Sequence, residues 1–72
     1  MKVKVANKIY RMTRKEFEGL LKVAAEQVPR GIYAILKGDY AELMNEKTTV
    51  TQGKALTRQL KAQGFKVYSN GI

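Results

Sequence analysis

A chain of 72 residues is long enough for one small domain, and 44% hydrophobic residues are too many for a disordered protein. The sequence has neither cysteine nor histidine, which excludes disulfides, thiolate nucleophiles, the usual zinc ligands and the commonest general base. Its formal net charge of +8 favours an anionic partner, although charge also serves solubility. We therefore expect a non-enzymatic binding protein that uses no cofactor and no metal ion.

Membrane insertion is not expected. The longest apolar run, residues 32–36, is far shorter than the roughly 20 residues that cross a bilayer. The N-terminal residues alternate lysine with valine and lack the hydrophobic core of an export signal. These features favour a cytoplasmic protein.

The charges are segregated along the chain. Residues 1–15 carry basic residues and no acid, residues 16–46 contain all six acids, and residues 47–72 are again purely basic. If the two terminal segments lie together in the fold, one side of the domain will be basic, as in proteins that bind nucleic acid.

The first predicted element is a hairpin over residues 2–12. Its alternation has period two around Asn7, and asparagine tolerates the positive φ of tight loops, so the loop is Ala6-Asn7 or Asn7-Lys8. Either loop gives the same two faces. The core face holds Val3, Val5, Tyr10 and Met12, and the opposite face holds Lys2, Lys4, Ile9 and Arg11.

A helix is predicted over residues 14–27. Thr13 and Glu16 have the spacing of a capping box, and apolar residues recur at helical intervals from Phe17 to Val28. Because Pro29 disfavours helical geometry at the residue before it, the helix should end near residue 27.

A second hairpin follows, with Gly38-Asp39 as its loop and Lys37 paired with Tyr40. Its core face is formed by Ile32, Ala34, Leu36, Ala41 and Leu43. The opposite face is formed by Tyr33, Ile35, Lys37, Tyr40, Glu42 and Met44. That second face is unusually apolar for a surface in contact with water, which suggests that it binds something.

The last two predicted elements are a helix over about residues 50–63 and a strand that begins at residue 65. Thr49 and Gln52 form a second capping-box pair, with Thr51 as an alternative cap. Gly64 is the expected residue in the C′ position that ends the helix. The final strand alternates Phe65 and Val67 against Lys66 and Tyr68.

The element order ββαββαβ predicts an α+β domain. The simplest arrangement is a two-layer sandwich, in which a mostly antiparallel sheet carries both helices on one face. Ferredoxin-like and dsRBD-like (double-stranded-RNA-binding-domain-like) variants are alternatives, the first of them if the N-terminal hairpin acts as one bent strand. The order of the strands in the sheet stays open.

Helices on one face would leave the other face of the sheet uncovered. That face would interleave tyrosines with cations, a combination that stacks bases and pairs with the phosphates of single-stranded nucleic acid, DNA or RNA. The RNP signature of RRM-type RNA-binding sheets is absent. The predicted nucleic-acid-binding residues of the sheet are Lys2, Lys4, Arg11, Tyr33, Lys37, Tyr40, Lys66 and Tyr68.

The second helix adds a basic stripe. Lys54, Arg58 and Lys61 are spaced by four and three residues, so they share one side of a helix that carries no acid. They could hold phosphates without reading bases, or they could simply be solvated.

A protein partner is the alternative function. The open face also carries Ile35 and Met44, so it could meet a second copy in a homodimer or dock as a small inhibitor or regulator on a host protein. Short basic chains of this kind are often found in phages and mobile elements. In the third interpretation the tyrosines are ordinary strand residues of an idle surface.

Overall fold

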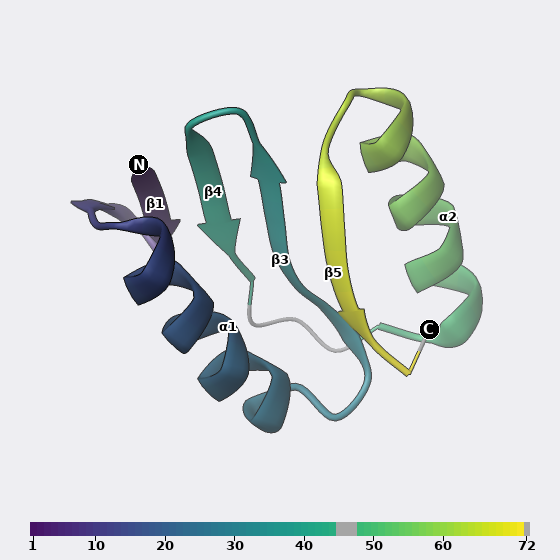
Figure 1. Ribbon diagram of the computed structural model, residues 1–72. Coiled ribbons are helices and arrows are strands. Elements are labelled where there is room, and N and C mark those ends of the chain that lie inside the picture. The colour runs from purple at the N-terminus through teal and green to yellow at the C-terminus, as the bar shows by residue number, and fades with distance from the viewer. Residues whose placement is uncertain (45–47, 72) are drawn as a thin grey trace.

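The computed structural model describes residues 1–44 and 48–71, and it has two helices and a five-stranded mixed sheet. The elements in chain order are β1 (Lys2–Val5), β2 (Lys8–Arg11), α1 (Arg14–Gln27), β3 (Gly31–Lys37), β4 (Tyr40–Leu43), α2 (Val50–Ala62) and β5 (Lys66–Asn70). The predicted α+β class and the order ββαββαβ are confirmed. In space the strands run β2-β1-β4-β3-β5, and only β1 and β4 pair in parallel. Figure 1 shows β1, β4, β3 and β5 in this order.

The second hairpin has the predicted register, and the first has one of the two registers that its sequence left open. In the first, Val3 pairs with Tyr10 and Lys2 with Arg11, around a loop at residues 6–7. In that loop Ala6, rather than the asparagine, takes a positive φ of 55°. In the second hairpin Lys37 pairs with Tyr40, as predicted from the two-residue loop.

The helix limits are also confirmed to within a residue. Thr13 and Thr49 each accept a hydrogen bond from the backbone N–H three residues later, and the reciprocal capping-box bonds are present in both helices. Gly64 follows α2 with a φ of +91° and donates its N–H to the carbonyl of Lys61, which identifies it as the C′ residue.

Asn70 joins the last strand to the end of α1. Its side-chain amide donates to the carbonyls of Ala25 and Val28, at 2.7 and 2.8 Å. Within a continuing helix the carbonyl of Ala25 would accept from the N–H of residue 29, but that residue is proline and has none. The Asn70 amide therefore supplies the donor that Pro29 lacks.

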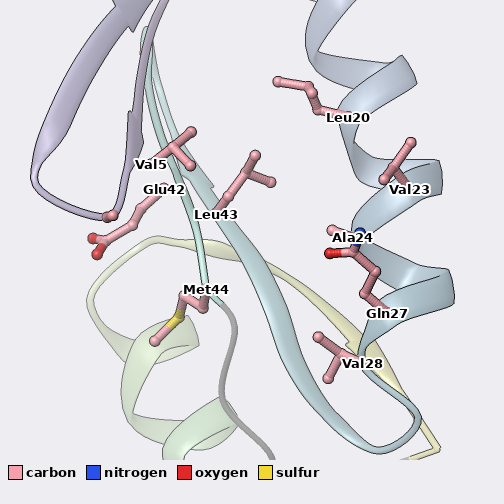
Figure 2. Close-up of a pocket in the computed structure, with 10 residues that line it drawn as sticks. Val5, Leu20, Val23, Ala24, Gln27, Val28, Glu42, Leu43 and Met44 are labelled. Carbon is pink, nitrogen blue, oxygen red and sulfur yellow. The ribbon is translucent and has the colours of Figure 1, made fainter.

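The prediction that both helices cover one face is wrong. The ring of Phe17 in α1 contacts that of Tyr68 in β5, with centroids 6.2 Å apart, so Tyr68 lies on the α1 side. The alternate residues Val67 and Ser69 instead line a groove with side chains of α2. Figure 2 shows α1 and α2 on opposite sides of β3 and β4.

The reason lies in the handedness of the crossovers. The connections β2-α1-β3 and β4-α2-β5 step across the sheet in the same direction, but β2 and β4 point in opposite directions. Right-handed crossovers then place the two helices on opposite faces. Because β1 and β2 are separate strands and the helices are on both faces, neither the ferredoxin-like nor the dsRBD-like variant describes this sheet.

A bulge in β3 places its first residues on the opposite faces of the sheet from those predicted by simple alternation. The pairing with β5 shifts between Ile32 and Ala34, which leaves Tyr33 as the extra residue. Tyr33 packs with the core cluster on the α1 side, which includes Val3, Phe17 and Ala34. Ile32 is buried as predicted, but it pairs with Ser69 and therefore lies on the α2 side rather than on the face of Ala34.

We predict that Asn70→Ala lowers the free energy of unfolding by about 1–3 kcal/mol, because two carbonyls at the end of α1 lose their donor. Asn70→Asp should cost at least as much, since its oxygens would face those carbonyls. Urea unfolding monitored by circular dichroism measures both. The exposed Gln59→Ala is the control and should change stability by less than about 0.5 kcal/mol. Equal losses in all three variants would contradict the proposed link.

Candidate nucleic-acid interface

Only part of the α2 side of the sheet is uncovered. The helix α2 packs mainly against β3 and β5, and among the described residues no other element covers β4, β1 and β2 on this side. We call this uncovered surface the open half. Its side chains are those of Lys2, Lys4, Ile9, Arg11, Tyr40 and Glu42, and Lys37 borders it.

The central feature of the open half is a row of side chains that crosses four strands. Lys2 in β1 is the register partner of Arg11 in β2 and of Tyr40 in β4, and Tyr40 is in turn the partner of Lys37 in β3. Neighbouring strands are about 4.8 Å apart, so the row extends over about 14 Å. It places three cations and one aromatic ring on the same face of the sheet.

A second row carries the single acid of this surface. Lys4 is the register partner of Ile9 on one side and of Glu42 on the other. Glu42 accepts a hydrogen bond of 3.3 Å from the hydroxyl of Tyr40. Partial burial, together with the negative charge and hydrogen bond of Glu42, raises the pKa of Tyr40. The Tyr40 ring is therefore oriented by a neighbour and stays protonated at neutral pH.

Three of the predicted sheet residues lie on the other face. Lys66 and Tyr68 pair with Leu36 and Ala34, whose side chains belong to the core on the α1 side. The bulge places Tyr33 on the same side, with its ring centroid 6.3 Å from that of Tyr68. The ammonium of Lys66 is 5.4 Å from the Tyr68 ring. The prediction that these three share a surface with Lys2, Lys4 and Arg11 is wrong, and Tyr40 is the tyrosine that remains there.

The two residues predicted for an apolar contact face are also covered to different degrees. Ile35 is only 6% exposed, because it lies on the α2 side where that helix packs. Met44 follows β4 and is half-buried, and its side chain points away from α1, on the same side of the strand as that of Glu42 (Figure 2). The open half is therefore cationic rather than apolar.

The basic stripe of α2 forms a separate surface. Lys54, Arg58 and Lys61, together with Thr57, line a groove of about 370 Å³ whose floor is Val67 and Ser69 of β5. The buried Gly53 marks the sheet-facing side of α2, and the stripe is offset from it by about a quarter of a turn. The stripe therefore faces the β5 edge of the sheet, and α2 stands between it and the open half.

The two faces of the sheet differ in charge. Among the described residues, the strands on the α2 side and α2 itself present one acid, Glu42, against seven cations: Lys2, Lys4, Arg11, Lys37, Lys54, Arg58 and Lys61. On α1, three acids (Glu16, Glu18, Glu26) match three cations (Arg14, Lys15, Lys22). The strands add Lys8 and Lys66 to the α1 side, so that side is not neutral, but the α2 side carries most of the net positive charge and is the predicted basic side.

One site was missed by the sequence analysis. An apolar cavity of about 540 Å³ lies between α1 and the ends of β1 and β4, with Val5, Leu20, Val23 and Leu43 among its walls (Figure 2). Val23 is 50% exposed and extends the apolar stripe of α1 towards β1. The sequence signal was this extra valine beside the predicted stripe. The side chain of Glu42 points away from the cavity, so its interior carries no charge (Figure 2).

Within residues 1–44 and 48–71, no three acidic side chains come together as a metal site would require, and neither helix is long and apolar enough to cross a membrane. Comparisons with protein families, curated proteins and solved structures find no match to this chain. Function must therefore be inferred from the surfaces themselves.

We predict that Glu42→Gln lowers the pKa of Tyr40, because the substitution removes the negative charge that disfavours the phenolate. Partial burial remains, so the pKa should stay above that of a free tyrosine. A pH titration of the tyrosine ring carbons by NMR measures the change. Glu18→Gln on α1 is the matched control and should leave Tyr40 unaffected. An unchanged Tyr40 in Glu42→Gln would show that the pair does not interact.

Proposed function

We propose that this protein binds single-stranded nucleic acid through the open half of its sheet, and that it acts by binding rather than by catalysis. The observation that carries the proposal is the row formed by Arg11, Lys2, Tyr40 and Lys37. In this arrangement the cations contact phosphates while the ring of Tyr40 stacks on a base.

The cross-strand pairing of like charges supports an anionic ligand. Lys2 and Arg11 are direct register partners, and like charges in that position destabilise a sheet. Two acids among the described residues lie near them, and both have other partners: Glu42 is hydrogen bonded to Tyr40 in the other row, and Asp39 forms an ion pair with the N-terminal ammonium. A phosphate backbone would offset the repulsion that the folded protein otherwise sustains.

A single strand suits this surface better than a duplex. The open half is formed by strands alone, so it contains no helix that could enter the major groove. Unpaired bases expose their faces, and one tyrosine in a row of cations can stack on one of them. With one ring available, affinity should depend mainly on charge and should discriminate little between sequences.

The alternative of a protein partner rested on an apolar open face. Its support is reduced at that surface, because Ile35 is covered by α2 and Tyr33 lies on the α1 side. The stripe of Lys54, Arg58 and Lys61 was also assigned to nucleic acid, but it faces the opposite edge of the molecule. A ligand on the open half would have to cross α2 to reach it.

We expect the double variant Lys2→Gln/Arg11→Gln to bind a labelled single-stranded oligonucleotide about 10-fold or more weakly near physiological salt. Each lost phosphate contact should also reduce the slope of log K against log salt by about 0.7. Fluorescence anisotropy at several salt concentrations measures both quantities.

The matched control is Lys15→Gln/Lys22→Gln, which removes the same charge from α1. It should leave the salt slope unchanged and the affinity nearly so. If the control loses as much affinity as the site variant, binding reflects net charge alone and the proposed interface is wrong.

Tyr40→Leu tests the stacking contribution separately. We expect it to weaken binding by about 5- to 150-fold, which corresponds to the 1–3 kcal/mol of one stacked base, without a change in the salt slope. Tyr40→Phe keeps the ring and should bind almost as well as the unmodified protein, although it loses the hydrogen bond to Glu42. Equal losses in both variants would show that the hydroxyl matters rather than stacking.

A further inference from the structure

The edge strand β5 has a free side. It is the last strand in the order β2-β1-β4-β3-β5, and it pairs only with β3. Among the described residues, no backbone group of β5 hydrogen bonds to anything except that neighbour. A free edge of this kind can accept an additional strand through backbone hydrogen bonds.

A cationic groove lies along the same edge. Its floor consists of Val67 and Ser69, which are alternate residues of β5 and so point to the α2 side. Its wall is the stripe of Lys54, Arg58 and Lys61, and the volume is about 370 Å³. None of the three wall cations forms an ion pair within the described residues. The groove therefore offers three uncompensated positive charges above the place where a sixth strand would lie.

We propose that this groove binds an extended acidic peptide segment of a protein partner, which adds to the sheet as a sixth strand beside β5. Backbone hydrogen bonds to β5 supply part of the affinity. Every second side chain of the added strand faces α2, and these side chains are the acidic ones, since they meet Lys54, Arg58 and Lys61.

Charge decides against a second copy of this chain as the occupant. Pairing of two β5 edges would bring the basic stripes of both copies into one groove. The other free edge, β2, is a weaker candidate for the peptide because no helix overhangs it and all its residues are exposed. Nucleic acid is disfavoured in the groove because none of its lining residues is aromatic and its floor is a strand edge suited to a peptide backbone.

The test uses the whole chain and a capped peptide of about ten residues, in which glutamate alternates with threonine. Amide NMR should show shifts and slowed hydrogen exchange at residues 66–70. The control peptide has the same sequence and charge, but its backbone is N-methylated at every second residue on the edge that would pair. It should bind at least 10-fold more weakly, because it cannot complete the ladder.

Two variants locate the site. Lys54→Gln/Arg58→Gln should lower the peptide affinity about 10-fold. Both positions are exposed, so the substitutions should not unfold the protein. Lys2→Gln/Arg11→Gln removes the same charge at the opposite end of the sheet and should leave the affinity unchanged. The effects of both variants on peptide affinity do not depend on whether the open half binds nucleic acid.

Three results would overturn the proposal. Equal binding of the N-methylated peptide would mean that charge alone attracts it. Shifts centred on residues 8–11 would place the added strand on β2. No peptide binding, with oligonucleotide shifts at residues 66–70 that Lys54→Gln/Arg58→Gln abolishes, would assign the groove to nucleic acid.

Discussion

The arrangement of this molecule depends on the parallel pairing of β1 with β4 at the centre of the sheet. Each of these strands belongs to a hairpin, and the parallel contact joins the two hairpins side by side. It also sets β2 and β4 in opposite directions, so that two right-handed crossovers must pass on opposite faces. One pairing therefore decides where both helices lie.

Helices on opposite faces divide the surface unequally. The helix α1 packs against β3, and its Phe17 belongs to the main core cluster. On the other face α2 covers the half over β3 and β5, where it buries Ile32 and Ile35. The remaining half carries side chains of β4 and of the first hairpin, whose strand β1 alternates lysine with valine and turns its lysines to this side. An uncovered and basic surface thus follows from topology together with the period-two pattern of residues 2–5.

Local signals in the sequence were sufficient for the parts of the fold that short turns and caps determine. The positions of Lys2, Arg11 and Tyr40 were correct because a two-residue loop fixes the parity of both strands in a hairpin. Tyr68 was misplaced because β5 follows a helix, and a helical connection does not fix which face a strand presents. Tyr33 was misplaced because β3 contains a bulge of one extra residue. No local sequence pattern in β3 predicted this bulge. Helix placement required the strand order, which arises from contacts between segments distant in sequence.

The charged surfaces also bear on the stability of the domain. A chain of this length buries a modest fraction of its surface and has a small margin of stability, and repulsion between Lys2 and Arg11, or along α2, reduces that margin. An anion that binds only the folded state raises the free energy of unfolding, and the increase grows with the anion concentration. If an anion binds as proposed, the same residues would lower the stability of the free protein and favour the complex. Cations on α1 do not act in this way, because Glu16, Glu18 and Glu26 on the same helix already compensate them.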